Sequence, residues 1–221
     1  MEREIIRTKD GSTTIHIKDW DECYHSKHGA IQEAQHVFIK NGLSLYQNQS
    51  VSILEIGFGT GLNAFITYLE SKKLDLEINY VGVEAYPVSI SELSAMNYVS
   101  ELNEDDKNAI FNLFHESNWE EKVVIDPFFT ITKRQQFFEE ITDCEQYDLI
   151  YFDAFGYRVQ PDLWSTSIFK KMHTALRPGG KLVTYAARGV VKRSMIEVGF
   201  TVEKLPGPPG KREMFRATKY K

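Results

Sequence analysis

The sequence predicts an α/β fold in which a mostly parallel sheet carries helices on both faces. Apolar runs typical of buried strands, such as Val51–Ile56 and Asp148–Phe152, alternate along the chain with segments of helical periodicity. A length of 221 residues suits one large domain of this class with a short N-terminal addition. The last two predicted strands, Phe200–Lys204 and Arg212–Thr218, flank a short Gly-Pro loop, so we expect an antiparallel pair at the C-terminus.

The N-terminal region is expected to form a small hairpin and a helix that pack on the core. Apolar and polar residues alternate on both sides of Asp10-Gly11, a dipeptide that favours a tight turn, which predicts strands at Glu4–Thr8 and Thr13–Lys18. Residues 28–40 have apolar side chains at helical spacing. We therefore expect an N-terminal segment over residues 1–45 and a core domain over residues 46–221.

The core alternates between predicted strands and helices. Its other expected strands are Ile78–Glu84, one within Lys122–Ile131, and Lys181–Tyr185. Its expected helices are Leu62–Ser71, one opened by Pro87, one or two in Glu101–Glu121, Leu163–Leu176 and Val190–Val198. Pro127 leaves the bounds of the third strand open. Arg177–Gly180 is expected to interrupt regular secondary structure before the fifth strand.

Composition favours a protein of the cytoplasm. The charged start Met1–Glu4 lacks the apolar core of a signal peptide, and no run of ~18 apolar residues could span a bilayer. Cys23 and Cys144 have no metal-type spacing and form no disulfide framework. The spacing of His25, His28 and His36 fits no clean set of metal ligands either.

The charges are unevenly distributed. The net charge is −5, yet the stretch Lys170–Lys221 holds thirteen Lys and Arg against three acids. This asymmetry indicates either a basic face that meets phosphates or ordinary solvated surface lysines.

The segment Leu54–Asn63 carries the strongest signal for a ligand. Gly57, Gly59 and Gly61 follow an apolar strand at alternate positions, and Glu55 precedes them. Glycines there allow a sharp turn and a close approach of the backbone to a ligand. The spacing G-x-G-x-G differs from the dinucleotide fingerprint and resembles motif I of the class I methyltransferases. That resemblance implies a Rossmann-like sheet and S-adenosylmethionine (SAM), while a different nucleotide cofactor stays open at this point.

Two acids complete the predicted site. Glu84 ends the second core strand, 23 residues beyond Gly61, where a carboxylate can accept hydrogen bonds from two ribose hydroxyls. Asp153 ends another strand and is followed by Phe155 and other aromatic residues. An alkylamine is mostly protonated near neutral pH, so a carboxylate beside it can orient it and help remove its proton. We expect Asp153 to face such an acceptor.

Further segments make the resemblance specific. The chain resembles the tRNA 5-aminomethyl-2-thiouridine methyltransferases, which methylate a wobble uridine. The matching segments are Tyr24–Ala30 with Glu33-Ala34, Leu54–Asn63, Asp153–Phe155 with Gln160–Trp164, and Pro206–Met214. Bifunctional members also carry a flavin-dependent oxidase domain, and since the sequence ends at Lys221 we expect the stand-alone methyltransferase. The resemblance therefore implies methyl transfer to the 5-aminomethyl amine without flavin or metal, on the anticodon region of tRNA, in functional partnership with a separate oxidase.

The resemblance also implies a role for each matching residue. The residues expected to hold SAM are Tyr24, Ser26, Glu55, Gly57, Gly59, Gly61, Asn63 and Glu84, and Asp153 is the expected catalytic residue. The residues expected to contact the substrate or tRNA are Phe155, Arg188, Lys192, Arg193, Lys211 and Arg212. For Lys211 and Arg212 a plain solvated hairpin tip is the alternative. Many class I enzymes carry an acid after the third strand that binds adenine, but the corresponding run Phe128–Lys133 contains no acid, so the contact to adenine is left unassigned.

Two other functions remain open from the sequence. One is aminopropyl transfer, as in spermidine synthase, which shares this fold and an aspartate after the fourth strand. The basic C-terminal quarter argues against it, because a polyamine substrate calls for acids around the pocket. The other is a tRNA-binding module without catalysis, which the intact Glu55, Glu84 and Asp153 argue against.

Overall fold

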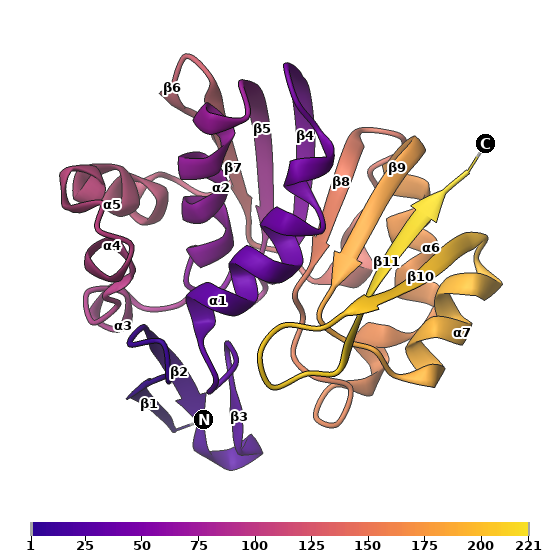
Figure 1. Cartoon of the computed structure of the whole chain (residues 1–221), viewed down its shortest axis with the longest axis horizontal. Helices are drawn as coiled ribbons and strands as arrows, with labels where there is room; N and C mark the ends of the chain where they lie inside the picture. The colour runs from indigo at the N-terminus through magenta and orange to yellow at the C-terminus, as the bar shows by residue number, and fades with distance from the viewer. Residues whose placement is uncertain (1, 221) are drawn as a thin grey trace.

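An eight-stranded sheet forms the centre of the computed structural model, which describes residues 2–220 (Figure 1). The strand order is β10-β11-β9-β8-β4-β5-β7-β6. The bounds are β4 (Gln49–Ile56), β5 (Leu76–Val83), β6 (Lys122–Asp126), β7 (Phe129–Arg134), β8 (Tyr147–Phe152), β9 (Leu176–Thr184), β10 (Phe200–Pro206) and β11 (Glu213–Lys219). The strands β9, β8, β4, β5 and β7 are parallel, whereas β11 is antiparallel to both β9 and β10. This topology confirms the predicted fold class.

Helices cover both faces of the sheet. Apolar residues of α1 (Ala30–Ala34), α2 (Leu62–Lys73) and α5 (Asn108–Glu116) share one buried cluster with β4, β5 and β7. Residues of α6 (Thr166–Ala175) and α7 (Gly189–Glu197) belong to a second cluster on the opposite face (Figure 1). Because these central strands are buried on both sides toward their carboxyl ends, most residues there are apolar, as in Ile53-Leu54 of β4 and Leu149–Phe152 of β8.

The predicted third strand is in fact a hairpin. Residues of β6 and β7 pair antiparallel, and Pro127 lies in the turn between them, where its missing N–H costs no ladder bond. The strand that joins the parallel sheet is β7, and it continues to Arg134, three residues beyond the predicted end at Ile131. The loop at the carboxyl end of this strand therefore starts at Gln135.

The helices also depart from the prediction in several places. The expected helix over residues 28–40 is α1 followed by a π-helical segment, Gln35–Lys40. Pro87 does not open a helix: α3 (Ile90–Leu93) starts after Ser89, where Ser89 and Glu92 form a capping box, and α4 (Tyr98–Glu101) follows. Before α6, Pro161–Trp164 is a separate 3₁₀ turn. Residues 177–180 do not precede the strand as a loop, because β9 includes them, with a shift in its register against β8.

The N-terminal residues form a small sheet of their own. The predicted hairpin is present as β1 (Arg3–Arg7) and β2 (Thr13–Ile17), and β3 (Glu22–Cys23) adds a third antiparallel strand. Figure 1 shows this segment in indigo below the main sheet, at the end toward which the arrow of β9 points. It therefore lies over the carboxyl ends of the parallel strands.

Candidate active site

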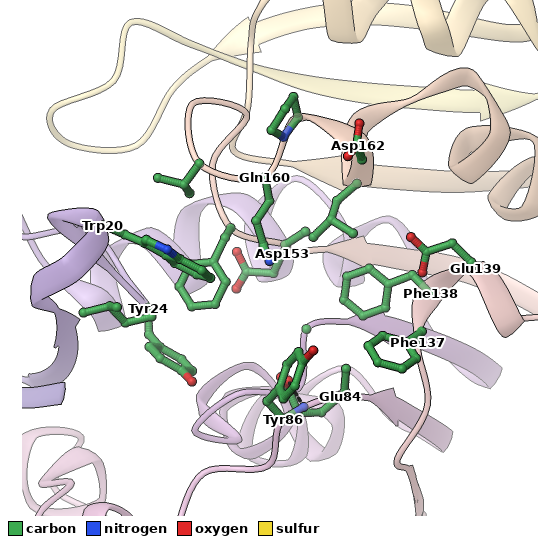
Figure 2. A pocket seen from close by; sticks show the side chains of 18 of the residues that line it. Trp20, Tyr24, Glu84, Tyr86, Phe137, Phe138, Glu139, Asp153, Gln160 and Asp162 are labelled. Atoms are coloured by element: carbon green, nitrogen blue, oxygen red, sulfur yellow. Dashed lines mark hydrogen bonds between the residues drawn. The ribbon is translucent and has the colours of Figure 1, made fainter. Parts of the chain in front are cut away.

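A cavity of about 380 Å³ opens at the carboxyl ends of the parallel strands (Figure 2). The loops after β4, β5, β7 and β8 contribute Gly57, Glu84, Phe137 and Asp153 to its wall, and the N-terminal segment closes it from the other side with Tyr24. The other lining residues are Arg3, Ile17, Trp20, Ala85, Tyr86, Phe138, Glu139, Ala154, Phe155, Val159, Gln160, Pro161, Asp162, Leu163 and Tyr185. Open parallel sheets bind their ligands at this position.

The glycine loop brings the backbone close to the end of β8. Gly57 has a φ of +89°, and a Cβ on it would lie 2.6 Å from the carbonyl oxygen of Asp153. Gly59 has a φ of +50°, and a Cβ on it would lie 3.2 Å from Cδ1 of Tyr24. Side chains at these positions would be strained and would push the loop away from the end of β8 and from Tyr24. Glycine thus allows the loop to pack closely against Asp153, and Gly57 lines the cavity beside it.

Gly61 has a different role. It is the N-cap of α2, has a φ of +71°, and a Cβ on it would lie 2.8 Å from the His115 ring. It does not line the cavity. Its glycine is explained by the left-handed backbone and by close packing, without a ligand.

Glu84 is held in place by the glycine loop. Its Oε2 accepts a hydrogen bond from the backbone N–H of Gly59 at 3.1 Å, and its Oε1 accepts one from the N–H of Tyr86 at 2.9 Å. The half-buried carboxylate lines the cavity, so its remaining lone pairs can accept from a ligand.

Asp153 lies at the centre of the cavity wall (Figure 2). Its backbone N–H donates to the carbonyl of Ile56 at 2.9 Å, which joins the ends of β8 and β4. Its Oδ2 accepts from Nδ2 of Asn63 at 2.8 Å. Burial, assisted by the negative charge of Glu33, raises the pKa of Asp153 to about 7 against the lowering effects of Asn63 and Lys211. A carboxylate of this kind can take up a proton near neutral pH.

Glu55 and Asn63, two expected cofactor contacts, lie behind the cavity wall. Glu55 is fully buried and accepts from Nδ2 of Asn63 at 2.9 Å and from the hydroxyl of Tyr80 at 2.8 Å. Neither residue is part of the cavity lining. Their connection to the site runs through Asp153.

Of the two cofactor contacts expected from the N-terminal segment, only one lines the cavity. Tyr24 lines the cavity, packs edge-on against Phe155 with ring centroids 5.0 Å apart, and has its pKa raised to about 12 by burial. Ser26 is outside that cavity: its N–H donates to Glu33 and its hydroxyl accepts from the N–H of His28. Ser26 therefore serves the local turn before α1.

Sequence reasoning missed the aromatic residues at the other end of the cavity. Phe137, Phe138 and Glu139 follow β7, and the ring of Phe137 packs edge-on against that of Tyr86 with centroids 5.9 Å apart. Both Tyr86 and Phe137 are more than half exposed, which is unusual for large apolar side chains. The third strand was predicted to end at Ile131, so Phe137 was not recognised as part of the loop that follows it. The two consecutive aromatic residues Phe137-Phe138, followed by two acids, could have indicated an aromatic wall there.

Three of the six residues expected to contact the substrate or tRNA, Arg188, Lys211 and Arg212, line a second cavity, whereas Phe155 lines the first. The second cavity, of about 450 Å³, shares Tyr185 with the first cavity. The guanidinium of Arg188 lies over the ring of Tyr157 at 5.5 Å from its centroid. Lys192 and Arg193 follow on α7 but do not line either cavity.

Lys211 differs from the expectation of a solvent-facing phosphate contact. Its ammonium forms an ion pair with Glu33 of α1 and lies over the ring of Tyr185, 3.7 Å from the centroid. The buried carboxylate of Glu33 attracts this cation inward. Lys211 thus links the loop before β11 to the N-terminal part of the chain.

Residues 2–220 contain no group of three or more His, Cys, Asp or Glu side chains placed to hold a metal ion. None of the helices described in the structure is long and apolar enough to cross a lipid bilayer.

Comparisons with known proteins agree with this geometry. The family model described as S-adenosyl-L-methionine-dependent methyltransferase matches residues 117–220. The bifunctional tRNA 5-methylaminomethyl-2-thiouridine biosynthesis protein MnmC of Hydrogenovibrio crunogenus is 28% identical over 224 residues, which cover 96% of this chain and 33% of that protein. The MnmC protein of Leptospira interrogans is 30% identical over 230 residues, or 95% of this chain and 34% of that protein. The chain spans about a third of the length of these curated relatives.

Solved structures show the same fold. The crystal structure of MnmC2 from Aquifex aeolicus superposes with a TM-score of 0.78 at 21% identity, covering 100% of this chain and 70% of that one. Spermidine synthase from Thermotoga maritima gives a TM-score of 0.56 at 13% identity, covering 97% and 72%. At these identities the likeness concerns the fold alone. The sequence matches carry the assignment further: residues 117–220 match the S-adenosyl-L-methionine-dependent methyltransferase family, the cofactor is SAM, and nearly the whole chain is similar to about a third of the bifunctional MnmC proteins.

Proposed function

We propose that this protein transfers a methyl group from SAM to the 5-aminomethyl amine of a wobble uridine or 2-thiouridine in tRNA. The observation that carries the proposal is the position of Asp153. It lines the cavity beside the glycine loop, and its pKa of about 7 suits proton exchange with an amine. The names of the curated relatives support tRNA as the substrate.

The cavity has the features that SAM requires. Gly57 presents its backbone to the cavity without a side chain, and Glu84 presents a fixed carboxylate for ribose hydroxyls. The exposed rings of Tyr86 and Phe137 offer an apolar contact for adenine. SAM, when bound, supplies an electrophilic methyl group, to which the nitrogen lone pair forms a C–N bond while the C–S electron pair remains on sulfur.

Asp153 prepares the acceptor for this reaction. An alkylammonium has no free lone pair, so it must lose a proton before nitrogen can attack. Asp153 accepts this proton and holds the amine in line, while Tyr24 and Phe155 exclude water from the same wall. The carboxylate then returns the proton to solvent after the product leaves.

The second cavity provides a place for the RNA backbone. Lys204, Lys211 and Arg216 in the basic C-terminal region are each paired with a glutamate. Over residues 2–220 no such ion pair involves Arg188 or Arg212, so both guanidinium groups can bind phosphate. Lys192 and Arg193 extend this surface along α7.

Methyl transfer to defined tRNA tests the proposal. Asp153→Asn should lower kcat/KM at least about 100-fold, the range of general acid-base catalysis, and should change the Kd for SAM less than about threefold. Asp148→Asn is the matched control, because Asp148 lies at the opposite end of β8 and binds Ser52 and Arg177. Equal activity of the two variants would contradict the role of Asp153.

Aminopropyl transfer is the second candidate, and one observation favours it. The first cavity is lined by four carboxylates, Glu84, Glu139, Asp153 and Asp162, against a single base, Arg3. Such a lining suits a polyamine as well as one ammonium group. Product formation from decarboxylated SAM and putrescine, with none from SAM and tRNA, would select this alternative.

A further inference from the structure

A buried chain of hydrogen bonds leads from Asp153 into the core. Nδ2 of Asn63 donates to Oδ2 of Asp153 at 2.8 Å and to Oε1 of Glu55 at 2.9 Å, and the hydroxyl of Tyr80 donates to Oε2 of Glu55 at 2.8 Å. Asn63 is 3% exposed, and both Glu55 and Tyr80 are fully buried. The methyl-transfer mechanism described above uses none of these three side chains.

The side-chain amide of Asn63 is oriented so that its Nδ2 group faces Glu55 and Asp153. Both of its amide protons serve carboxylates, while its Oδ1 is buried without a hydrogen-bond partner within the described residues. An unpaired buried carbonyl costs stability, and an asparagine with only a structural role would be expected to satisfy it. The orientation is therefore set by the need to donate to the two carboxylates.

We propose that Asn63 is a positioning residue that binds Oδ2 of Asp153 and leaves Oδ1 as the oxygen that takes the proton from the acceptor amine. Glu55 and Tyr80 maintain this arrangement, because Glu55 accepts from both neighbours and keeps Nδ2 turned toward Asp153. The inference rests on the proposed function only for the identity of the proton donor.

The proton transfer that this arrangement serves is simple. An N–H bond of the ammonium breaks, its electron pair stays on nitrogen, and the proton joins Oδ1 of Asp153. Oδ2 continues to accept from Asn63, so the carboxyl group does not rotate during the step. A fixed carboxylate keeps the amine nitrogen aligned for attack.

Other groups around Asp153 also influence its titration. Glu33 of α1 raises the pKa of Asp153, and Lys211 of the loop before β11 lowers it. Tyr185 lies beside them after β9, and burial holds its pKa well above its usual range, so it stays neutral. The hydrogen bond from Asn63 favours the ionised form, and its loss should raise the pKa of Asp153.

Direct titration of the Asp153 carboxyl by ¹³C NMR tests this inference in the intact protein without any acceptor. Asn63→Ala should move the Asp153 transition upward by about one pH unit, as loss of a charge-assisted hydrogen bond predicts. Thr67→Val is the matched control: Thr67 is fully buried on the same helix and binds the Asn63 carbonyl and Tyr151 instead. Asn63→Ser, which is too short to bridge both carboxylates, gives the same shift if the alanine variant does not fold.

The methyl-transfer rate supplies the second measurement. At a pH where Asp153 is ionised in every variant, kcat of Asn63→Ala should remain about tenfold below that of Thr67→Val, since the carboxylate is no longer fixed. An unchanged Asp153 transition in both Asn63 variants would overturn the inference. A shifted transition in a protein that methylates no tRNA would keep the inference and overturn the proposed function.

Discussion

Glu55 and Asp153 are both carboxylates at the carboxyl ends of parallel strands, and burial separates their chemistry. Asp153 is half-buried in the cavity wall, whereas Glu55 is completely enclosed by Asn63, Tyr80 and the core. Burial raises the pKa of Glu55 well above its ordinary value, more than its hydrogen bonds lower it. Glu55 thus lies behind the cavity wall, and Asp153 lines the cavity.

This difference predicts how stability depends on pH. The folded chain holds a proton on Glu55 that the unfolded chain releases above about pH 4.5, so the resulting stability is complete below that pH and is lost as pH rises toward the folded pKa. Glu55→Gln removes this titration. We expect the free energy of unfolding in urea to fall less between about pH 5 and pH 9 in the variant than in the wild type. The two slopes should differ by at most about 1.4 kcal/mol per pH unit. Glu70→Gln, on the same helix as Asn63, serves as the control, and parallel curves for Glu55→Gln and wild type would contradict the prediction.

At the scale of elements, strands with strong apolar patterns were predictable and loop geometry was not. Val51–Ile56 and Asp148–Phe152 lie within β4 and β8, because burial on both faces leaves an apolar run that periodicity detects. Pro127 correctly indicated that the predicted third strand is interrupted. One proline does not distinguish a turn between two strands from the end of a single strand. The aromatic wall at Phe137 was missed for this reason.

Long-range contacts were equally hidden from the sequence. The motif Leu54–Asn63 predicted the glycine turn after β4, since local glycine spacing determines that turn. The pairing of Lys211 with Glu33 joins residues far apart in the chain, and no local pattern reveals it. Sequence therefore indicated which residues surround the site, and the structure separated those that line it from those that support it.

The Lys211–Glu33 contact should stabilise the closed arrangement of α1 and the loop before β11. Lys211→Met leaves the buried Glu33 carboxylate without its cation, and should lower the free energy of unfolding by about 1–3 kcal/mol, a range reduced for partial solvent exposure. Lys204→Met is the control, because Lys204 pairs with Glu213 at the surface and should cost less than about 1 kcal/mol. Equal losses in urea unfolding would show that Lys211 has no special role.

At the scale of the whole molecule, ion pairs neutralise part of the basic C-terminal region. Arg177, Lys204, Arg216 and Lys219 form ion pairs within the fold. Arg188 and Arg212 instead line the second cavity, which shares Tyr185 with the cavity that Asp153 lines. A net charge of −5 is therefore compatible with a local phosphate-binding surface.

Salt dependence tests this surface. The slope of log K against log salt for tRNA binding should fall by about one for Arg188→Ala and by about one for Arg212→Ala, because each removes a phosphate contact. Arg216→Ala should leave the slope unchanged, since Arg216 is already bound to Glu203. Fluorescence anisotropy titrations at several salt concentrations provide the measurement, and three identical slopes would place the RNA elsewhere.

The most direct test of the central claim is nucleoside mass spectrometry after incubation of the purified protein with SAM and tRNA that carries 5-aminomethyl-2-thiouridine. We predict complete conversion of that nucleoside to its 5-methylaminomethyl form by the wild-type protein and by Asp148→Asn, and none by Asp153→Asn at the same enzyme concentration. Unmodified 5-aminomethyl-2-thiouridine after incubation with folded, SAM-bound wild-type protein would contradict the claim.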